Sequence, residues 1–491
     1  MSTTVDAHRL QRNAVGLAPT LFQSITHMAP AAAVAFSIIV GVPYAGGSIP
    51  LAVLLALIAC LLCAISIGQL AKHLPSAGGL YTFSSRGLGA PVGFLVAWGF
   101  MMAEPIVAPL LYLIFGNELA ANLNSHFGWP LWLWAPSAVL AGLIVWFLTY
   151  RGIRLSTEAG VALGAFEIII FLALAITLIV SAGSNNTLTV FAPNTGNAHG
   201  LGSVFPGMIF AILAFIGFEA SAPLGEEARD PRRTIPRAVI LSCLLVGIFY
   251  LVNYYAASVY FGPSKMAAKF TTFNSGDPWS GMAQAVWGPG IILVILAVLN
   301  SAIANSNAGV NAATRVGYAL GRIGLLPRPF ARVHDRFKTP YIAIHVQAIG
   351  GIILAVGLGA IAGEPRPLNA FALLGTLATI IVVAIYILTN LSNLVFYARE
   401  RRSEFNWLLN GAVPVVGSII FLPALVAAFG IDFAGLGITA LAPPANLAPI
   451  IIGVWMVIGV ALLIYFAVRD PGRITQTGRV FVDDEEAPIR S

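Results

Sequence analysis

The sequence predicts an all-α integral membrane protein, and three observations support this fold class. The 491 residues are 58% hydrophobic and only 9% charged, whereas soluble domains contain about 25% charged residues. The apolar residues are gathered in segments long enough to cross a bilayer as a helix, which takes about 20 residues. No polar stretch between these segments is long enough to bury a core of its own.

Twelve apolar segments are candidates for membrane-spanning helices. We expect them at about 18–46, 48–72, 87–120, 131–150, 156–182, 202–224, 236–261, 285–318, 341–362, 367–397, 411–431 and 447–468. Residues 1–17 carry charge and no apolar region ahead of a cleavage site, so we expect the first span to be retained rather than removed as a signal peptide.

The distribution of basic residues predicts the orientation of these spans. With the N-terminus inside, all of the 26 Lys and Arg residues fall in cytoplasmic segments except Lys265, Lys269 and Arg366. Basic residues collect in cytoplasmic loops. This pattern predicts an even number of spans, with residues 1–17 and 469–491 both cytoplasmic, and explains the net charge of +6 without a nucleic-acid partner.

The sixth span contains an acidic residue beside a glycine, in the run Phe215-Ile-Gly-Phe-Glu219. A carboxylate at membrane depth is costly unless it faces a cavity or a partner. Gly217 weakens the helix at the same place. A helix interrupted in the membrane is tolerated only where its free backbone groups line an enclosed cavity. This run therefore predicts part of a binding site.

The first span contains a second interruption, at Pro30 in Thr26-His-Met-Ala-Pro-Ala-Ala-Ala33. Proline removes one amide donor and displaces the carbonyl four residues earlier. Taken alone, this pattern is equally typical of a simple proline kink. Interruptions in both span one and span six are the expected mark of two inverted repeats of five helices with a site between them.

Three stretches of the chain resemble the permeases of the amino acid–polyamine–organocation (APC) superfamily. They are Leu74-Pro-Ser-Ala-Gly-Gly-Leu-Tyr81 after span two, the Phe-Ile-Gly-Phe-Glu block followed by Glu226-Glu-Ala-Arg-Asp-Pro-Arg-Arg-Thr-Ile-Pro-Arg237, and Arg315-Val-Gly-Tyr-Ala-Leu-Gly-Arg322 with Val333-His-Asp-Arg-Phe-Lys-Thr-Pro340. Their order and spacing match over about residues 15–400, while the last two spans are generic.

The resemblance implies the five-plus-five inverted-repeat, LeuT-like fold with discontinuous helices 1 and 6. The core would be 18–397, with repeats at about 18–182 and 202–397, followed by helices 11 and 12 at 411–468. It also implies transport by alternating access, usually coupled to protons or run as exchange. Importing an amino acid or related amine across the plasma membrane is the leading interpretation, and a polyamine or diamine permease or a substrate exchanger is the alternative.

The resemblance also implies a substrate site. Family members bind a substrate carboxylate on amides of span one and its amine on carbonyls that precede the break in span six. The chain has Pro-Ala-Ala-Ala where the family usually has a glycine-rich loop. The candidate substrate-binding residues are Met28, Ala31, Ala32, Ala33, Ala103, Glu104, Leu213, Phe215, Ile216, Gly217 and Phe218. Phe215 and Phe218 either close over the substrate or pack as ordinary aromatic residues.

Glu104 lies within span three, at a position that faces the substrate side chain in related transporters. A second amine on the substrate would pair with this acid, since an ion pair away from bulk water is stronger than one in solvent. Alternatively, Glu104 hydrogen-bonds the backbone that Pro105 leaves free. Together with Glu167 and Glu219 it is one of three acids that we place at membrane depth, where no Lys or Arg is expected.

Five residues are candidates for coupling transport to an ion, either a proton or Na⁺; they are His27, Glu167, Glu219, Ser301 and Asn305. Glu167 falls where some family members carry a lysine in place of the sodium of sodium-driven relatives. Ser301 and Asn305 lie one helical turn apart, and bonding between helices explains them equally well. His27 either titrates near neutral pH or simply bonds to a neighbouring helix.

Two other classes of function compete with a transporter. Channels line a pore with repeated rings from several subunits, whereas this chain has one asymmetric polar site. A membrane enzyme is disfavoured because the seven histidines are scattered and form no metal-ligand cluster. We therefore expect no enzymatic activity, cofactor or metal. The expected partners are a small-molecule substrate and the lipid bilayer, with no nucleic acid and no obligatory protein partner.

Overall fold

The computed structural model describes residues 15–76, 78–196, 198–322, 324, 326–363, 366–432, 435–470, 472 and 474. Within these ranges the protein is helical, and the only strand-like contact is an isolated bridge between Val15 and Ala228. Most of the predicted cytoplasmic tails, residues 1–14 and 475–491, lie outside the described residues.

The first half of the chain forms helices α1 to α8. Their bounds are Leu17–His27 (α1), Pro30–Ala32 (α2), Val42–Ala45 (α3), Ile49–Ala71 (α4), Leu80–Leu88 (α5), Ala90–Phe127 (α6), Trp134–Arg151 (α7) and Ile153–Ala182 (α8). The short π-helical turn η2, Ala33–Ser37, continues α2.

The second half forms helices α9 to α16. Their bounds are Leu201–Phe215 (α9), Pro231–Phe261 (α10), Pro278–Trp287 (α11), Ile291–Arg322 (α12), Tyr341–Ile361 (α13), Arg366–Arg399 (α14), Val413–Ala428 (α15) and Ala448–Arg469 (α16). The 3₁₀ helix η8, Phe218–Glu226, follows α9, and a π-helical turn, Trp407–Ala412, leads into α15.

Eleven helical stretches in the described part of the chain are long and apolar enough to cross a membrane. This confirms the predicted class, an all-helical protein with many membrane spans. The first two predicted spans fall in one continuous stretch of 55 residues, Leu17–Ala71. The other ten stretches each overlap one of the remaining predicted spans.

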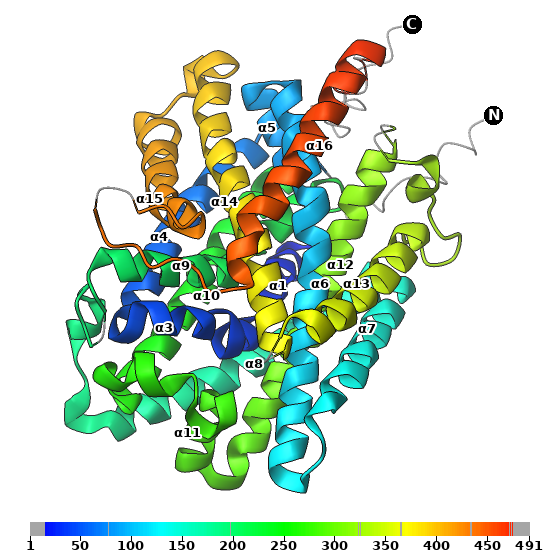
Figure 1. The fold of residues 1–491 in the computed structure, drawn as a ribbon. Coiled ribbons are helices and arrows are strands. Elements are labelled where there is room, and N and C mark those ends of the chain that lie inside the picture. Colours follow the sequence, from blue (N-terminus) through cyan, green and yellow to red (C-terminus); the bar gives the residue numbers. More distant parts are fainter. Residues whose placement is uncertain are drawn as a thin grey trace, which may run out of the picture.

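The helices differ in how deeply they are buried. In the apolar part of Leu201–Glu226, which contains α9, 94% of the residues are buried, against 17% in Ala445–Arg469, which contains α16. Helix α1 packs against α8, α10 and α12, and α9 packs against α4 and α14. Figure 1 shows α1 at the centre of the bundle and α16 along its outside. Among the described stretches, the interrupted segment that contains α9 is therefore the best shielded from lipid.

The outer helix α16 is attached to α6 by a pair of tryptophans. The rings of Trp98 and Trp455 stack with centroids 4.3 Å apart. Each indole N–H donates to the backbone carbonyl of the other residue, at 2.9 and 3.0 Å. Gly459 makes room for this contact, because a Cβ there would lie 2.3 Å from the Trp98 ring.

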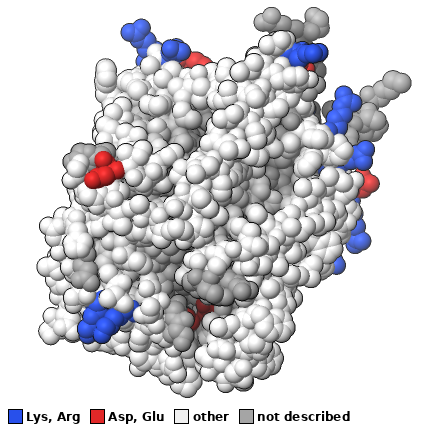
Figure 2. Space-filling model, viewed as in Figure 1, with Lys and Arg blue, Asp and Glu red and all other residues white. Residues whose placement is uncertain are grey.

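Charged side chains gather at the ends of the bundle. Figure 2 shows a broad uncharged band, with most Lys and Arg side chains on the rim beside the two chain ends. One basic side chain is buried instead: Arg315 of α12 forms an ion pair with Glu227 at 2.9 Å, with 8% and 4% of the two side chains exposed.

A fourth acidic residue joins the three that were placed at membrane depth. Glu118 of α6 is 1% exposed, and its carboxylate accepts a hydrogen bond from the Asn122 side chain at 3.0 Å. The prediction missed it because Glu118 lies close to the end of the third apolar segment. Asn122, one turn along the same helix, therefore satisfies part of the hydrogen-bonding capacity of the Glu118 carboxylate.

Candidate functional site

The first helical segment is interrupted beside Pro30. Helix α1 ends at His27, Ala29 adopts a left-handed conformation with φ of 47°, and Pro30 begins α2. Proline suits the first position of a helix because its φ is fixed and no amide is needed there. The chain therefore leaves helical geometry at Ala29, inside the bundle, while Met28 still has right-handed helical dihedral angles.

The second interruption lies between α9 and η8. Ile216 is extended, and Gly217 has φ of 117°, which disfavours a side chain. A Cβ on Gly217 would lie only 2.2 Å from Cδ2 of His27. The imidazole of His27 therefore packs directly on the glycine, and the two interruptions meet at this contact.

Tyr250 of α10 connects the two interruptions. Its hydroxyl lies 2.6 Å from the Met28 carbonyl and 2.8 Å from the Ala214 carbonyl, so it can donate to either. One turn later, the hydroxyl of Tyr254 donates to the Val34 carbonyl at 2.7 Å. Both side chains are fully buried. Sequence reasoning missed these residues, although two tyrosines four positions apart in an apolar span indicate a polar helix face.

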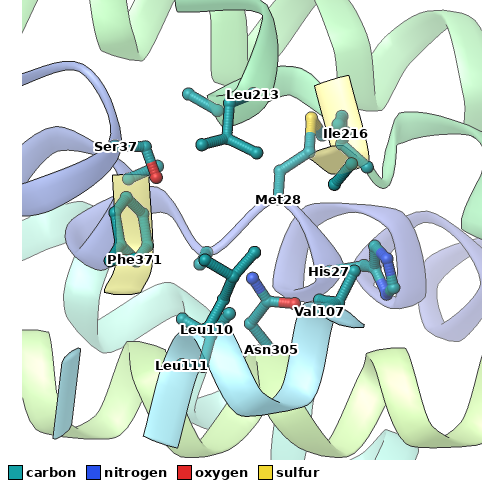
Figure 3. A pocket seen from close by; sticks show the side chains of 14 residues that line it. His27, Met28, Ser37, Val107, Leu110, Leu111, Leu213, Ile216, Asn305 and Phe371 are labelled. Carbon is teal, nitrogen blue, oxygen red and sulfur yellow. The ribbon is translucent and has the colours of Figure 1, made fainter. Parts of the chain in front are cut away.

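A cavity lies beside the interruptions and is lined by α1, η2, α6, α9, α12 and α14, together with Met28, Ala29 and Ile216 at the interruptions. Figure 3 shows Leu213 and Ile216 on one side, Val107, Leu110 and Leu111 on the opposite side, and Met28 between them. The cavity offers about 30 Å³ to the centre of a water molecule. One water needs about 10–15 Å³ by this measure. In this conformation the cavity therefore holds one or two waters, and an amino acid or amine requires the helices to move apart.

Six of the predicted residues line this first cavity; they are His27, Met28, Ala33, Leu213, Ile216 and Asn305. The prediction missed the other lining residues, which include Ser37 and Phe371. The oxygen Oδ1 of Asn305 has no hydrogen-bond partner among the described residues. Asn305 was grouped with Ser301, but it faces the cavity instead.

Six predicted substrate-binding residues line neither this cavity nor the second one described below; they are Ala31, Ala32, Ala103, Phe215, Gly217 and Phe218. The ring of Phe215 packs edge-on against Tyr250, with centroids 5.3 Å apart. Phe218 packs against Tyr386 at 5.0 Å. Both rings are fully buried in these contacts. Gly217 acts by its missing side chain, which leaves space for His27.

Glu104 and Glu219 line a second, smaller cavity, together with Gly78, Leu80, Phe100, Ala220, Pro223, Ala312 and Val316. One oxygen of Glu219, Oε2, accepts hydrogen bonds from the Tyr386 hydroxyl at 2.7 Å and from the Gly217 amide at 3.1 Å. Glu219 therefore stabilises the end of the α9 interruption. Its other oxygen, and Oε2 of Glu104, have no hydrogen-bond partner among the described residues.

His27 lies between the two cavities. Its ring lines the first cavity, and Nε2 lies 3.7 Å from Oε2 of Glu104, which lines the second. Both side chains are buried, with 0% and 7% exposed.

Glu167 and Ser301 lie on the other side of α2. Oε2 of Glu167 accepts a hydrogen bond from the Ala31 amide at 3.3 Å, and the Ser301 hydroxyl accepts one from the Ala32 amide at 3.1 Å. The Ala33 amide donates to the Ala29 carbonyl at 2.7 Å. The amides that were expected to hold a substrate carboxylate are thus bonded within the protein.

Among the described residues, no group of three or more His, Cys, Asp or Glu side chains could hold a metal ion. The arrangement is a small cavity between interrupted helices, with backbone groups, one imidazole and buried carboxylates close by. Fold and site together define the class of protein, a multi-pass membrane protein with a small cavity at interrupted helices.

Comparison with known proteins identifies the family. The amino acid permease family profile matches residues 20–472, which is nearly the whole chain. The chain therefore belongs to the amino acid permeases of the APC superfamily, and this confirms the resemblance.

The curated relatives are transporters of several kinds. The low-affinity putrescine importer PlaP of Escherichia coli K12 is 26% identical over 451 residues, which cover 88% of this chain and 93% of the importer. The branched-chain amino acid permease BcaP of Bacillus subtilis is 25% identical over 71% of this chain and 74% of its own. Mouse cationic amino acid transporter 4 is 26% identical over 69% of this chain and 54% of its own.

Proposed function

We propose that this permease is a secondary active transporter that imports an amino acid or related amine across the plasma membrane by alternating access. The observation that carries the proposal is the first cavity, which lies where α1 and α9 both leave helical geometry. Interrupted helices that meet at a buried cavity are typical of sites that alternate between the two sides of a membrane.

The proposal includes twelve membrane crossings arranged as two inverted repeats. A straight helix of 55 residues would be about 80 Å long, far more than the ~30 Å hydrocarbon core of a bilayer. Leu17–Ala71 contains both the interruption at Ala29 and a turn at Gly46–Ser48. We therefore count two crossings in it. Twelve crossings leave both chain ends on one side, the cytoplasmic side by the positive-inside rule.

The coupling ion in this proposal is the proton. Oε1 of Glu167 has no hydrogen-bond partner among the described residues, although the side chain is fully buried. A buried carboxylate with a free oxygen can take up and release a proton. Collapse of the proton gradient is expected to reduce uptake, and Glu167→Gln to make the remaining uptake less sensitive to pH. If Na⁺ alone drives uptake at constant pH, proton coupling is wrong.

The test of the site is Asn305→Leu. Oδ1 of Asn305 has no hydrogen-bond partner among the described residues, so the substitution removes this polar atom from the cavity without breaking a hydrogen bond to it. A lost hydrogen bond to a charged ligand is worth about 1.5–3 kcal/mol, so the KM for uptake should rise about tenfold or more.

Asn307→Leu is the matched control. Asn307 lies on the same helix, is equally buried, and also has an unpartnered Oδ1, but lines neither cavity. Uptake of radiolabelled amines and amino acids into proteoliposomes would be compared for both variants. An Asn305→Leu protein with the KM of the wild type would place the site elsewhere.

A further inference from the structure

Three consecutive amides at the start of the α2 segment have their donors in use. The Ala31 amide is bonded to the carboxylate of Glu167, the Ala32 amide to the hydroxyl of Ser301 and the Ala33 amide to a backbone carbonyl. A substrate carboxylate would have to displace Glu167 to reach the first of these amides. Glu167 comes from α8 and is fully buried, so bulk water is not at hand to compensate for its displacement.

The charges around the two cavities also disfavour an anionic group. The polar side chains that line the first cavity are His27, Ser37 and Asn305, and those of the second are Glu104 and Glu219. No Lys or Arg is found among the lining residues that the structure describes. A substrate carboxylate would thus enter a region with buried acids and no guanidinium or ammonium group, where like charges repel strongly.

Positively charged groups, by contrast, find unused acceptors. Oε2 of Glu104 and Oε1 of Glu219 are buried, lack partners among the described residues, and belong to side chains that line one cavity. Unpaired buried carboxylate oxygens are unfavourable, and an ammonium group bonds to them strongly. Asn305 offers a further free oxygen in the first cavity.

We propose that Glu167 determines specificity by occupying the place of a substrate carboxylate, so that the transporter takes an aliphatic diamine rather than an amino acid. This inference rests on the proposed transport function and narrows its substrate class. The carboxylate of Glu167 completes the backbone hydrogen bonds of the α2 segment from within the protein. The substrate then needs only ammonium groups, which Asn305, Glu104 and Glu219 accept.

The experiment compares two compounds that differ by one carboxylate. Ornithine is 1,4-diaminobutane with a carboxylate on one terminal carbon. In the first assay, the two compounds compete for exchange by the wild-type protein in proteoliposomes, which needs no ion gradient. In the second assay, each compound is tested for thermal stabilisation of the purified protein, which measures binding without transport. The expected result is an inhibition constant at least about tenfold lower for 1,4-diaminobutane, a hydrogen-bond-sized difference.

Glu167→Ala should free the Ala31 amide and remove the repelling charge, so the preference for 1,4-diaminobutane over ornithine should shrink about tenfold or more. Glu118→Gln is the matched control, because Glu118 is also a buried acid but lines neither cavity; it should leave the preference unchanged. Glu167→Gln keeps an oxygen that can accept from Ala31 and should give a smaller change than Glu167→Ala.

Two outcomes would overturn the inference. The first is a wild-type protein that binds ornithine as tightly as 1,4-diaminobutane. The second is a Glu167→Ala protein whose preference for 1,4-diaminobutane over ornithine is unchanged in the binding assay. In either case, exchange of any amine or amino acid would leave the proposed transport function intact. Absence of exchange with the whole panel, by a folded wild-type protein, would instead contradict the proposed function.

Discussion

Glu104 carries the clearest consequence at the scale of single residues. Its carboxylate lies 3.7 Å from His27 on one side and lines the second cavity on the other, with one oxygen unpartnered among the described residues. The alternative role of Glu104 is a hydrogen bond to the Met101 carbonyl, which Pro105 leaves without its helical donor. Oε2 of Glu104 makes no such bond among the described residues. Glu104 is therefore available to a cation.

Glu104→Gln should weaken competition by diamines and leave neutral amino acids almost unaffected. A charge-assisted hydrogen bond contributes about 1.5–3 kcal/mol, so the inhibition constant of a diamine should rise about tenfold to a hundredfold. Competition against a radiolabelled substrate measures both classes in one assay. Equal effects on diamines and neutral amino acids would mean that Glu104 is structural.

At the scale of elements, the contact between the two interruptions has a structural consequence that can be measured. Gly217 has a positive φ and no space for a Cβ, because His27 occupies it. Gly217→Ala should therefore displace the end of α1, lower the unfolding temperature and abolish uptake.

Gly128→Ala is the control for the backbone conformation alone. Gly128 also has a left-handed backbone, with φ of 68°, but no atom lies within 4 Å of where its Cβ would be. Both substitutions bear the cost of a left-handed conformation, about 1–2 kcal/mol, and only Gly217→Ala adds the clash. Similar losses in unfolding temperature and uptake for both variants would show that the His27 contact is unimportant.

The ion pair between Arg315 and Glu227 provides a second prediction at the scale of elements. Arg315 of α12 and Glu227, directly after η8, form a buried ion pair at 2.9 Å. Arg315→Ala leaves an uncompensated buried charge, which should lower the free energy of unfolding by about 3–5 kcal/mol. Arg86 and Glu400 are closer, at 2.6 Å, but each side chain is 38% exposed. Arg86→Ala should therefore cost only about 0–1 kcal/mol.

Chemical unfolding in detergent would compare the two variants. The ion pair joins α12 to the segment that continues from the α9 interruption, so Arg315→Ala should also change the rate of exchange. Equal stability losses for Arg315→Ala and Arg86→Ala would show that burial does not set the strength of this contact.

The sequence was sufficient to predict where the two helices are interrupted. Pro30 and Gly217 act on their own backbone, so their effect is local and is visible in the order of residues. It was not sufficient to predict what the freed amides bind. Glu167 is 136 positions from Ala31 and reaches it only because α8 packs against α1 and α2.

The separation of Glu104 and Glu219 from the first cavity was also beyond the sequence. Glu104 was expected at the substrate and Glu219 among the coupling residues, and neither expectation placed the two acids together in a second cavity. The position of the His27 ring against Gly217 creates the division, since it fills the space next to the interruption. A side-chain orientation of this kind depends on the packing of several helices.

At the scale of the whole molecule, the central claim is that the protein is a carrier whose site faces one side of the membrane at a time. The first cavity has space for only one or two waters in this conformation, so no continuous path for a solute passes through it. A carrier of this kind exchanges substrate across the membrane in alternating steps, whereas a channel lets solutes flow down their gradients.

Counterflow tests this claim most directly. Proteoliposomes loaded with an excess of unlabelled 1,4-diaminobutane and diluted into a trace of the labelled compound should accumulate label transiently above its outside concentration, with no ion gradient present. Liposomes without internal substrate should accumulate none. Uptake that only equilibrates, at the same rate in loaded and empty proteoliposomes, would contradict alternating access and indicate a channel.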